Sequence, residues 1–262
     1  MKQGEGSLYS GFFAEFYDIL HAGLTDVDSY IEFGHRFGPD ILELGSGTGR
    51  ILIPMAKAGF NVTGIDLSDD MIARCLAKLA LEDETLRSRV TIVKQDITQF
   101  CLARKYDLII APCNMISHFV EPARLLQALC CVKRHLKQTG VFILDNSVPD
   151  IPYMVYINRV ERIFGFEHPL TGTRIIDRFR STYDFVNQLE HNSIYLEEYD
   201  DAGNLLRKAG CSDTMAYFFP RELRVMLEIS GLEVFDEQGS LLEKTPIDAD
   251  STEMVFFCRL AL

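Results

Sequence analysis

The stretch ILELGSGTGR, residues 41–50, places three glycines within five positions directly after an apolar run. Glycine lets the backbone turn tightly and lets a ligand approach closely, because no Cβ stands in the way. The following residues Ile51, Leu52, Met55 and Ala56 have the spacing of a helix with one apolar face. A glycine turn between a strand and a helix is typical of the ligand-binding edge of an α/β sheet, although such turns also serve as plain connections.

Outward from this turn, short apolar runs alternate with helical patterns through the first 150 residues. Runs such as LIIA and VFIL are apolar at every position, as expected for parallel strands covered on both faces. The alternation therefore predicts a doubly wound α/β sheet. The expected strands are 40–44, 61–66, 89–96, 106–112 and 140–146, and the expected helices are 48–58, 69–80 and 121–137.

The pattern changes after Asp145. Residues 157–217 show no helical periodicity but several alternating segments, with turns expected at NQLEHN (187–192) and DDAGN (200–204). The second turn is a good hairpin signal, since glycine and asparagine adopt positive φ readily. We expect an antiparallel β insertion here, after the fifth strand. A helix within FPRELRVMLEISG (219–231) and two last strands, in LEVFDEQG and EMVFFCRLAL, complete a seven-stranded sheet.

Composition and charge narrow the range of partners. The 262 residues are 47% hydrophobic and carry a formal net charge of −12, which disfavours nucleic acid and favours a small-molecule partner. Seven cysteines include no CxxC pair and no zinc-like spacing with histidine, so we expect reduced thiols and no metal. The first 20 residues lack the pattern of a secretory signal, and no apolar run reaches the roughly 18–20 residues that span a bilayer. We expect a soluble, cytoplasmic protein without a membrane partner.

Two acidic residues lie where the next strands end. Asp66 closes the second strand in GIDLSDDMI and is well placed to accept hydrogen bonds from both hydroxyls of a ribose. Asp96 closes the third strand in VKQDITQF. Taken singly, each of these acids fits an exposed carboxylate or a helix cap as well as it fits a ligand contact. Together with the glycine turn, they predict a nucleoside site.

The glycine spacing does not fit a dinucleotide fingerprint, which requires G-x-G-x-x-G, because Arg50 stands where the third glycine belongs. The chain reads Glu43-x-Gly45-x-Gly47-x-Gly49 instead, which resembles motif I of the class I S-adenosylmethionine-dependent methyltransferases. GIDLSDDMI, KQDITQF and YDLIIAPCNMISHF are similar to the later motifs of that family, in their usual order. The resemblance covers residues 38–147 and is specific for the cofactor, but much less specific for the acceptor.

The resemblance implies a division of the chain into four regions. N-terminal cap helices would cover residues 1–37, and the S-adenosylmethionine-binding core would cover residues 38–150. Residues 151–217 would form an antiparallel roof over the substrate. The closing helix and the last two core strands would occupy residues 218–262.

The same resemblance implies cofactor contacts for particular residues. The backbone around Gly45 and Gly47 would line the methionine moiety, and Glu43 would steady the turn that Gly49 completes. Asp66 would bind the ribose. The remaining implied contacts are Leu67 and Met71 beside the adenine, Asp96 and the Ile97 amide at its edge, the Ala111 or Pro112 carbonyl at the ammonium group, and Asn114 at the cofactor or acceptor.

Two implied contacts have open alternatives. FFAEFYDIL (12–20) is similar to the helix that caps the cofactor in the small-molecule branch, so Tyr17 would touch the methionine carboxylate. The same pattern fits an amphipathic helix that packs Phe13, Phe16 and Tyr17 against the core. Arg50 would neutralise that carboxylate or an acidic acceptor, or form a salt bridge with a neighbouring acid.

Methyl transfer is an in-line displacement on a methyl group activated by a sulfonium, so alignment supplies much of the rate. His118, in CNMISHF (113–119), is the best general base and substrate contact near the transferred methyl, but it could equally be a packing histidine. The β insertion is similar to the roof of sugar-amine and glycine-type N-methyltransferases. Arg178, Tyr183 and Tyr195 are its candidate substrate contacts, and each also fits a cross-strand pair on a solvated sheet.

These observations favour N- or O-methylation of a small molecule. The D/N-P-P-aromatic sequence expected of base-modifying enzymes is absent after the fourth strand, where Ala111-Pro112-Cys113-Asn114 stands. Two alternatives stay open: a noncatalytic module that senses S-adenosylmethionine, and a nicotinamide-dependent oxidoreductase, which Arg50 disfavours. The acceptor and the oligomeric state are not specified by the sequence.

Overall fold

A computed structural model describes residues 8–261 of the chain. The chain divides into two compact units, Met1–Tyr17 with Asp150–Tyr217 and Asp18–Pro149 with Phe218–Leu262. Residues 1–7 of the expected cap region and residue 262 of the closing region lie outside the described residues. The functional assignment of the four expected regions stays a prediction.

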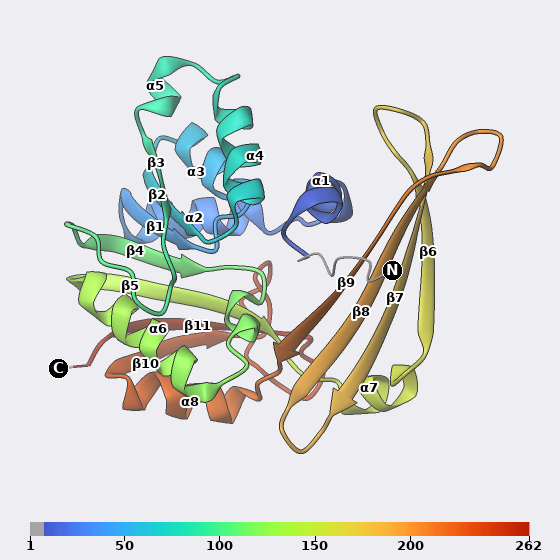
Figure 1. Ribbon diagram of the computed structural model, residues 1–262. Coiled ribbons are helices and arrows are strands. Elements are labelled where there is room, and N and C mark those ends of the chain that lie inside the picture. Colours follow the sequence, from blue (N-terminus) through green and yellow to red (C-terminus); the bar gives the residue numbers. More distant parts are fainter. Residues whose placement is uncertain (1–7, 262) are drawn as a thin grey trace. The chain divides into compact units, whose positions relative to one another are not determined.

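The larger unit contains a seven-stranded sheet in the order β10-β11-β5-β4-β1-β2-β3 (Figure 1). Strands β1 to β5 run parallel to one another, whereas β11 is antiparallel to both β5 and β10. The expected doubly wound α/β sheet is therefore confirmed. Its strands are β1 (Asp40–Leu44), β2 (Asn61–Asp66), β3 (Val90–Lys94), β4 (Tyr106–Ala111), β5 (Leu136–Ser147), β10 (Leu232–Gln238) and β11 (Glu253–Leu260).

Helices connect most of these strands. The helix after the glycine turn begins at Leu52, later than the expected residue 48, because Gly49 still has a positive φ of 80°. The helix α1 (Gly11–Leu20) spans the boundary between the two units. The helices of the larger unit are α2 (Val27–Phe37), α3 (Leu52–Lys57), α4 (Asp69–Leu79), α5 (Glu84–Arg87), the 3₁₀ helix η1 (Met115–His118), α6 (Pro122–His135) and α8 (Pro220–Ile229).

The core explains why the central strands are apolar throughout. Successive side chains of a strand point to opposite faces of the sheet. Leu108, Ile109 and Ile110 of β4 are nevertheless all fully buried, so both faces of the sheet are covered. On one side, Phe257 of β11 packs edge-on against Phe33 of α2, with ring centroids 5.2 Å apart. This contact holds α2 against the sheet.

The smaller unit contains an antiparallel sheet in the order β6-β7-β8-β9, which confirms the expected insertion. Its strands are β6 (Glu161–Glu167), β7 (Arg174–Asp184), β8 (Leu189–Tyr199) and β9 (Leu205–Ala216). The hairpin turn at DDAGN is also confirmed, since it joins β8 to β9 and Gly203 has a φ of 83°.

Three details of the insertion differ from the sequence prediction. The insertion opens with the helix α7 (Ile151–Ile157), which is capped by the Asp150 side chain accepting from the Tyr153 N–H at 3.0 Å. The strand β6 was not foreseen, because its exposed residues hardly alternate in burial. The turn expected at 187–192 occupies 185–188 instead, since Asp184 accepts backbone hydrogen bonds from Val186 and Asn187 and ends β7 early.

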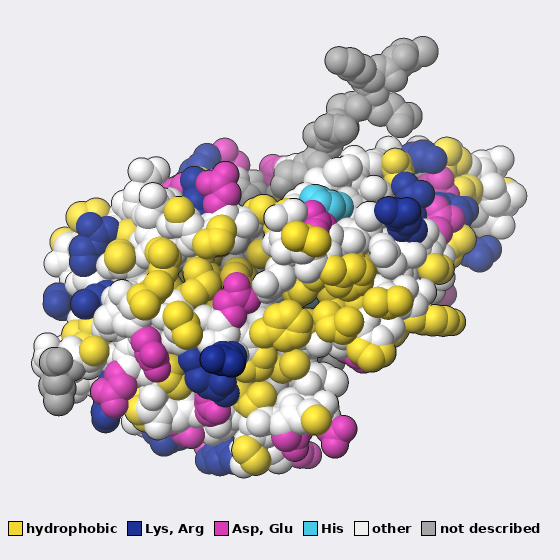
Figure 2. Space-filling model, turned by 90° about the horizontal axis from the view of Figure 1, so that it is seen from below, with side chains coloured by type: hydrophobic (Ala, Val, Ile, Leu, Met, Phe, Trp, Pro, Cys, Tyr) yellow, Lys and Arg dark blue, Asp and Glu magenta, His cyan; other side chains and the backbone are white. Residues whose placement is uncertain are grey.

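Hydrophobic side chains also reach the surface (Figure 2). Ile163 and Phe164 of the edge strand β6 are both about half exposed, as are Tyr153 and Val155 of α7. Over residues 8–261, no helix is both long enough and apolar enough to cross a membrane.

Candidate functional site

The turn after β1 depends on three glycines. Gly45, Gly47 and Gly49 have φ values of 71°, 53° and 80°, a region that other residues rarely adopt. A Cβ on Gly45 would lie 2.9 Å from Met115 Cγ, and a Cβ on Gly49 would lie 2.5 Å from Cys75 Sγ. Both the backbone conformation and the packing therefore require glycine here.

Asp66, the last residue of β2, holds this turn. Its Oδ2 accepts the Gly47 N–H at 2.7 Å, and its Oδ1 accepts the Ser68 N–H at 2.8 Å. An ionised carboxylate offers about four acceptor sites. Each oxygen of Asp66 can thus accept one further hydrogen bond, which suits a pair of neighbouring hydroxyls.

Apolar side chains lie next to Asp66. Leu67 follows it directly and is 62% exposed, so its side chain offers apolar surface beside the turn. Met71, on the first turn of α4, is buried, and its Cε would lie 3.3 Å from a Cβ on Gly47. The structure thus brings Leu67 and Met71 to the same turn as Asp66, and their contact with an adenine stays a prediction.

Glu43 and Ser46 carry buried polar atoms of this turn. Neither Glu43 Oε2 nor Ser46 Oγ has a hydrogen-bond partner within the described part of the chain. Burial raises the pKa of the Glu43 carboxyl well above its usual range, against the opposing charge of Arg50. Buried polar atoms in native proteins are nearly always satisfied. The turn is therefore suited to a further polar group.

Arg50 forms a salt bridge with Asp26, the residue before α2. Its Nη1 and Nη2 donate to the two carboxylate oxygens at 2.5 Å and 2.8 Å, and the two side chains are only 15% and 11% exposed. Burial alone would raise the pKa of Asp26, but the hydrogen bonds of Arg50 and Cys113 and the Arg50 charge lower it. Of the alternatives for Arg50, the structure therefore shows the salt bridge with a neighbouring acid.

Asp96 lies just beyond β3 and is already engaged. Its Oδ1 accepts from the Thr98 N–H and hydroxyl at 2.9 Å and 2.8 Å, and its Oδ2 accepts from Arg124 at 2.9 Å. Partial burial opposes ionisation, but these donors outweigh it and lower the pKa of Asp96. The neighbouring Ile97 is half-buried. Contact of Asp96 and Ile97 with an adenine stays a prediction.

The segment after β4 has an unusual backbone. Ala111 and Pro112 are buried, and the next two residues, Cys113 and Asn114, both have a φ of 57°. The half-buried His118 ends the 3₁₀ helix that follows. The expected base and the expected carbonyl groups thus lie on one short segment.

Asp145, near the end of β5, was not singled out from the sequence. Its carboxylate accepts the Cys113 N–H at 3.1 Å and 3.0 Å and the Tyr30 hydroxyl. Burial raises the pKa of Asp145 to about 7, against these donors. An acid at the end of the otherwise apolar run VFILDN was the one available signal.

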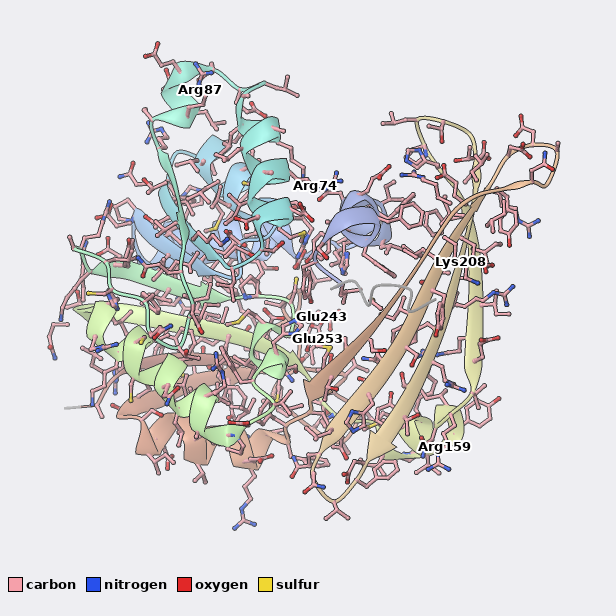
Figure 3. All side chains as sticks on the ribbon, in the orientation of Figure 1. Arg74, Arg87, Arg159, Lys208, Glu243 and Glu253 are labelled. Carbon is pink, nitrogen blue, oxygen red and sulfur yellow. The ribbon has the colours of Figure 1, made fainter. Side chains whose placement is uncertain are left out.

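The expected substrate contacts of the insertion do not form one group. Arg178 and Tyr195 are register partners and therefore share one face of the sheet. On this face Glu197 accepts from Arg178 at 3.3 Å and from Lys208, labelled on β9 in Figure 3, at 2.8 Å. Arg178 thus forms the cross-strand pair that was its alternative, and the contact of Arg178 and Tyr195 with a substrate stays a prediction.

Tyr183 lies on the opposite face, since it is an odd number of residues from Arg178 along β7. Its hydroxyl donates to Glu190 at 3.0 Å, and burial together with Glu190 raises the pKa of Tyr183 to about 12. The register places Asp177 and Asp213 on this face, and each has one buried oxygen without a partner in residues 8–261.

Helix α1 lies partly in the smaller unit. Phe16 packs edge-on against His168 with ring centroids 5.4 Å apart, and Phe13 is also buried. Tyr17 is half-buried, with its ring 6.2 Å from that of Tyr9. The contact of Tyr17 with a cofactor stays a prediction. Across residues 8–261, no three His, Cys, Asp or Glu side chains are grouped to hold a metal ion.

Comparison with known proteins relates this arrangement to one family. The family described as "Methyltransferase domain" matches residues 41–140. The chain is 36% identical over 174 residues to the ubiquinone biosynthesis O-methyltransferase of Hydrogenovibrio crunogenus, covering 64% of the chain and 68% of the relative. It is 26% identical over 257 residues to the cypemycin N-terminal methyltransferase of Streptomyces sp, covering 95% and 96%.

In fold, the chain is similar to the CcbJ methyltransferase from Streptomyces caelestis. The TM-score is 0.80 at 21% identity, and the match covers 98% of this chain and 99% of that one. Other curated relatives match over less: the alignments span about half the length of two putative methyltransferases, from Geobacillus sp. and Bacillus subtilis.

We expect Gly49→Ala to destabilise the protein more than Gly203→Ala. Both glycines have nearly the same φ, 80° and 83°, so the cost of the left-handed backbone, about 1–2 kcal/mol, is shared. Only a Cβ at position 49 meets other atoms, since nothing lies within 4 Å of one at position 203. Overpacking adds about 1–3 kcal/mol. Urea unfolding of the two variants measures the difference, and equal losses would contradict the packing account of the turn.

Proposed function

Because the chain belongs to the class I S-adenosylmethionine-dependent methyltransferase family, we propose that it transfers a methyl group from S-adenosylmethionine to an amine-bearing small molecule. The observation that carries this proposal is the glycine turn tied to Asp66 at the carboxyl ends of β1 and β2. Open α/β sheets bind ligands at this edge.

The residues of the turn fit this cofactor. Asp66 retains an acceptor site on each oxygen for the two ribose hydroxyls, and Leu67 and Met71 offer apolar surface to the adenine. Gly45 and Gly47 leave room for the methionine moiety, and the unsatisfied atoms of Glu43 and Ser46 suit its polar groups. When bound, the cofactor supplies a methyl group that its sulfonium charge activates.

An amine is the acceptor best supported. The cypemycin N-terminal methyltransferase, whose alignment runs through the whole insertion, is by name an amine-modifying enzyme. A sugar N-methyltransferase, KedS8, shares the fold over 99% of both chains. The net charge of −12 also supports a small molecule over a nucleic acid. The O-methyltransferase that is 36% identical aligns with only 64% of this chain, whereas the cypemycin enzyme aligns with 95% of it.

Within this proposal the chain aligns the acceptor and removes a proton. An amine attacks only in its neutral form, so His118 serves as the base that keeps it neutral. Asn114 and the Ala111 and Pro112 carbonyls, on the same segment, hold the methionine end of the cofactor. The acceptor contacts the Tyr183 face of the insertion, where the unpartnered oxygens of Asp177 and Asp213 suit amino and hydroxyl donors.

The proposed function predicts formation of S-adenosylhomocysteine when the protein is mixed with S-adenosylmethionine and a panel of amino sugars and other small amines. Mass spectrometry detects both the product and the methylated amine. Cofactor binding without turnover on any amine, alcohol or metabolite extract would favour the noncatalytic sensing module instead.

Asp66→Asn is expected to weaken binding of S-adenosylmethionine roughly 10- to 100-fold, because hydrogen bonds to a charged group contribute about 1.5–3 kcal/mol. The matched control is Asp69→Asn, three residues away, whose side chain is exposed and pairs with Lys94. Calorimetry compares the variants. Equal affinities of Asp66→Asn and the native protein would remove Asp66 from the ribose site.

His118→Gln is expected to lower the rate of turnover by about 10²–10⁴-fold, the usual contribution of general base catalysis, and to leave cofactor affinity unchanged. The exposed His35 on α2 provides the control His35→Gln. A pH–rate profile with an unchanged acidic limb in His118→Gln would show that this histidine only packs.

Tyr183→Phe is expected to raise KM for the acceptor several-fold, whereas Tyr195→Phe leaves it unchanged, because the two hydroxyls lie on opposite faces of the same sheet. Steady-state kinetics with the amine found in the screen tests both variants. The reverse order of effects would assign the acceptor to the Arg178 face.

A further inference from the structure

Three consecutive residues at the end of β5 fasten the segment that follows β4. Asp145 accepts the Cys113 N–H at 3.1 Å and 3.0 Å, and Asn146 Oδ1 accepts the Ser117 hydroxyl at 3.0 Å. The Ser147 N–H donates to Asn114 Oδ1 at 2.5 Å. This set of contacts between residues 145–147 and residues 113–117 is called the β5 clamp below.

The clamp holds a stretch of backbone, Cys113–Asn114, in an unfavourable conformation. Cys113 and Asn114 are consecutive non-glycine residues with a φ of 57°. Asparagine tolerates this left-handed region, but cysteine rarely adopts it. Such conformations persist only where the surroundings enforce them, and they concentrate at functional sites. Within this turn, the Cys113 N–H donates to both oxygens of the Asp145 carboxylate.

Asp145 is itself held in place. It is only 8% exposed, and the fully buried Tyr30 of α2 donates its hydroxyl to it. Asp26 and Arg50 are the other charged groups nearby, and they bond the Cys113 thiol rather than the Asp145 carboxylate. An amide at position 145 would turn an NH₂ group towards these donors, because both carboxylate oxygens already accept.

The clamped segment also touches the glycine turn. Met115 Cγ would lie only 2.9 Å from a Cβ on Gly45, and the Cys113 thiol accepts a hydrogen bond from Arg50, the residue that follows Gly49. The position of residues 113–118 therefore sets the spacing between the glycine turn and the end of β4. In a methyltransferase of this fold, that spacing has to match the methionine end of the cofactor.

We propose that Asp145 is a positioning residue for methyl transfer, which rests on the function proposed above. Through the β5 clamp, its carboxylate keeps the Cys113–Asn114 turn left-handed and so places the Pro112 carbonyl and His118 against the glycine turn. Asp145 touches neither cofactor nor acceptor in this role. Its loss acts through the segment that it holds.

The test compares Asp145→Asn and Tyr30→Phe with the control Asp236→Asn. Asp236 lies on β10 of the same sheet, and its carboxylate accepts the N–H of the adjacent Glu237 at 3.0 Å. Calorimetry with S-adenosylhomocysteine gives the affinity, and amide hydrogen exchange reports on residues 113–118. Thermal unfolding monitors the whole fold.

We expect Asp145→Asn to weaken S-adenosylhomocysteine binding by about tenfold or more and to speed exchange selectively at residues 113–118. Tyr30→Phe keeps the carboxylate and should act in the same direction but less, by a few-fold. Asp236→Asn should change neither property. If Asp145→Asn does not fold, Tyr30→Phe carries the test.

Two results would overturn the proposal while leaving the function intact. One is native affinity in both Asp145→Asn and Tyr30→Phe. The other is faster exchange spread evenly over the strands with unchanged affinity, since that would make Asp145 a core residue only. Failure of the native protein itself to bind S-adenosylhomocysteine would instead refute the proposed function, and the positioning role with it.

Discussion

The hydrogen bond from the Gly47 N–H to the Asp66 carboxylate is the interaction on which the site depends. It is possible because β1 and β2 are parallel neighbours in register, with Leu44 beside Ile65. Their carboxyl ends therefore meet at one edge of the sheet, and the turn that leaves β1 meets the acid that ends β2. The glycines allow the positive φ angles of this turn, and the hydrogen bond to Asp66 stabilises the turn in that conformation.

A second strand-ending acid holds the turn of a neighbouring parallel strand in the same way. β4 and β5 are also parallel neighbours, and the acid at the end of β5 holds the turn that leaves β4. Asp66 thus shapes the turn that carries Gly47, and Asp145 shapes the turn that carries Asn114. Met115 and Arg50 join the two turns, so the geometry of each constrains the other. A ligand placed across this edge meets both.

The sequence predicted the sheet well because its signals are local. Apolar runs, turn glycines and strand-ending acids are each read within a few residues, and β1 and β2 fall at their expected bounds. The pairing of Arg50 with Asp26 was only one of several open options, because the two residues are 24 apart in sequence and only the fold brings them together. The left-handed turn at Cys113 had no local signal at all, since its conformation is imposed by Asp145 from another strand.

The insertion shows a second limit. Candidate contacts could be chosen by residue type, but whether two of them share a face depends on strand register, which the sequence did not fix. Arg178 and Tyr195 proved to be partners across β7 and β8, and Tyr183 faces the other way. β6 was missed for a related reason: an edge strand with exposed side chains has little of the alternation on which strand prediction rests.

The central claim is that the edge formed by β1 and β2 holds an adenosyl cofactor with a methionine end. Competition binding with labelled S-adenosylmethionine tests it most directly on the native protein. We predict saturable binding at a single site, displaced by S-adenosylhomocysteine, more weakly by adenosine, and not by nicotinamide dinucleotides. Absence of saturable binding by well-folded protein, or displacement by a nicotinamide dinucleotide in preference to S-adenosylhomocysteine, would contradict the account.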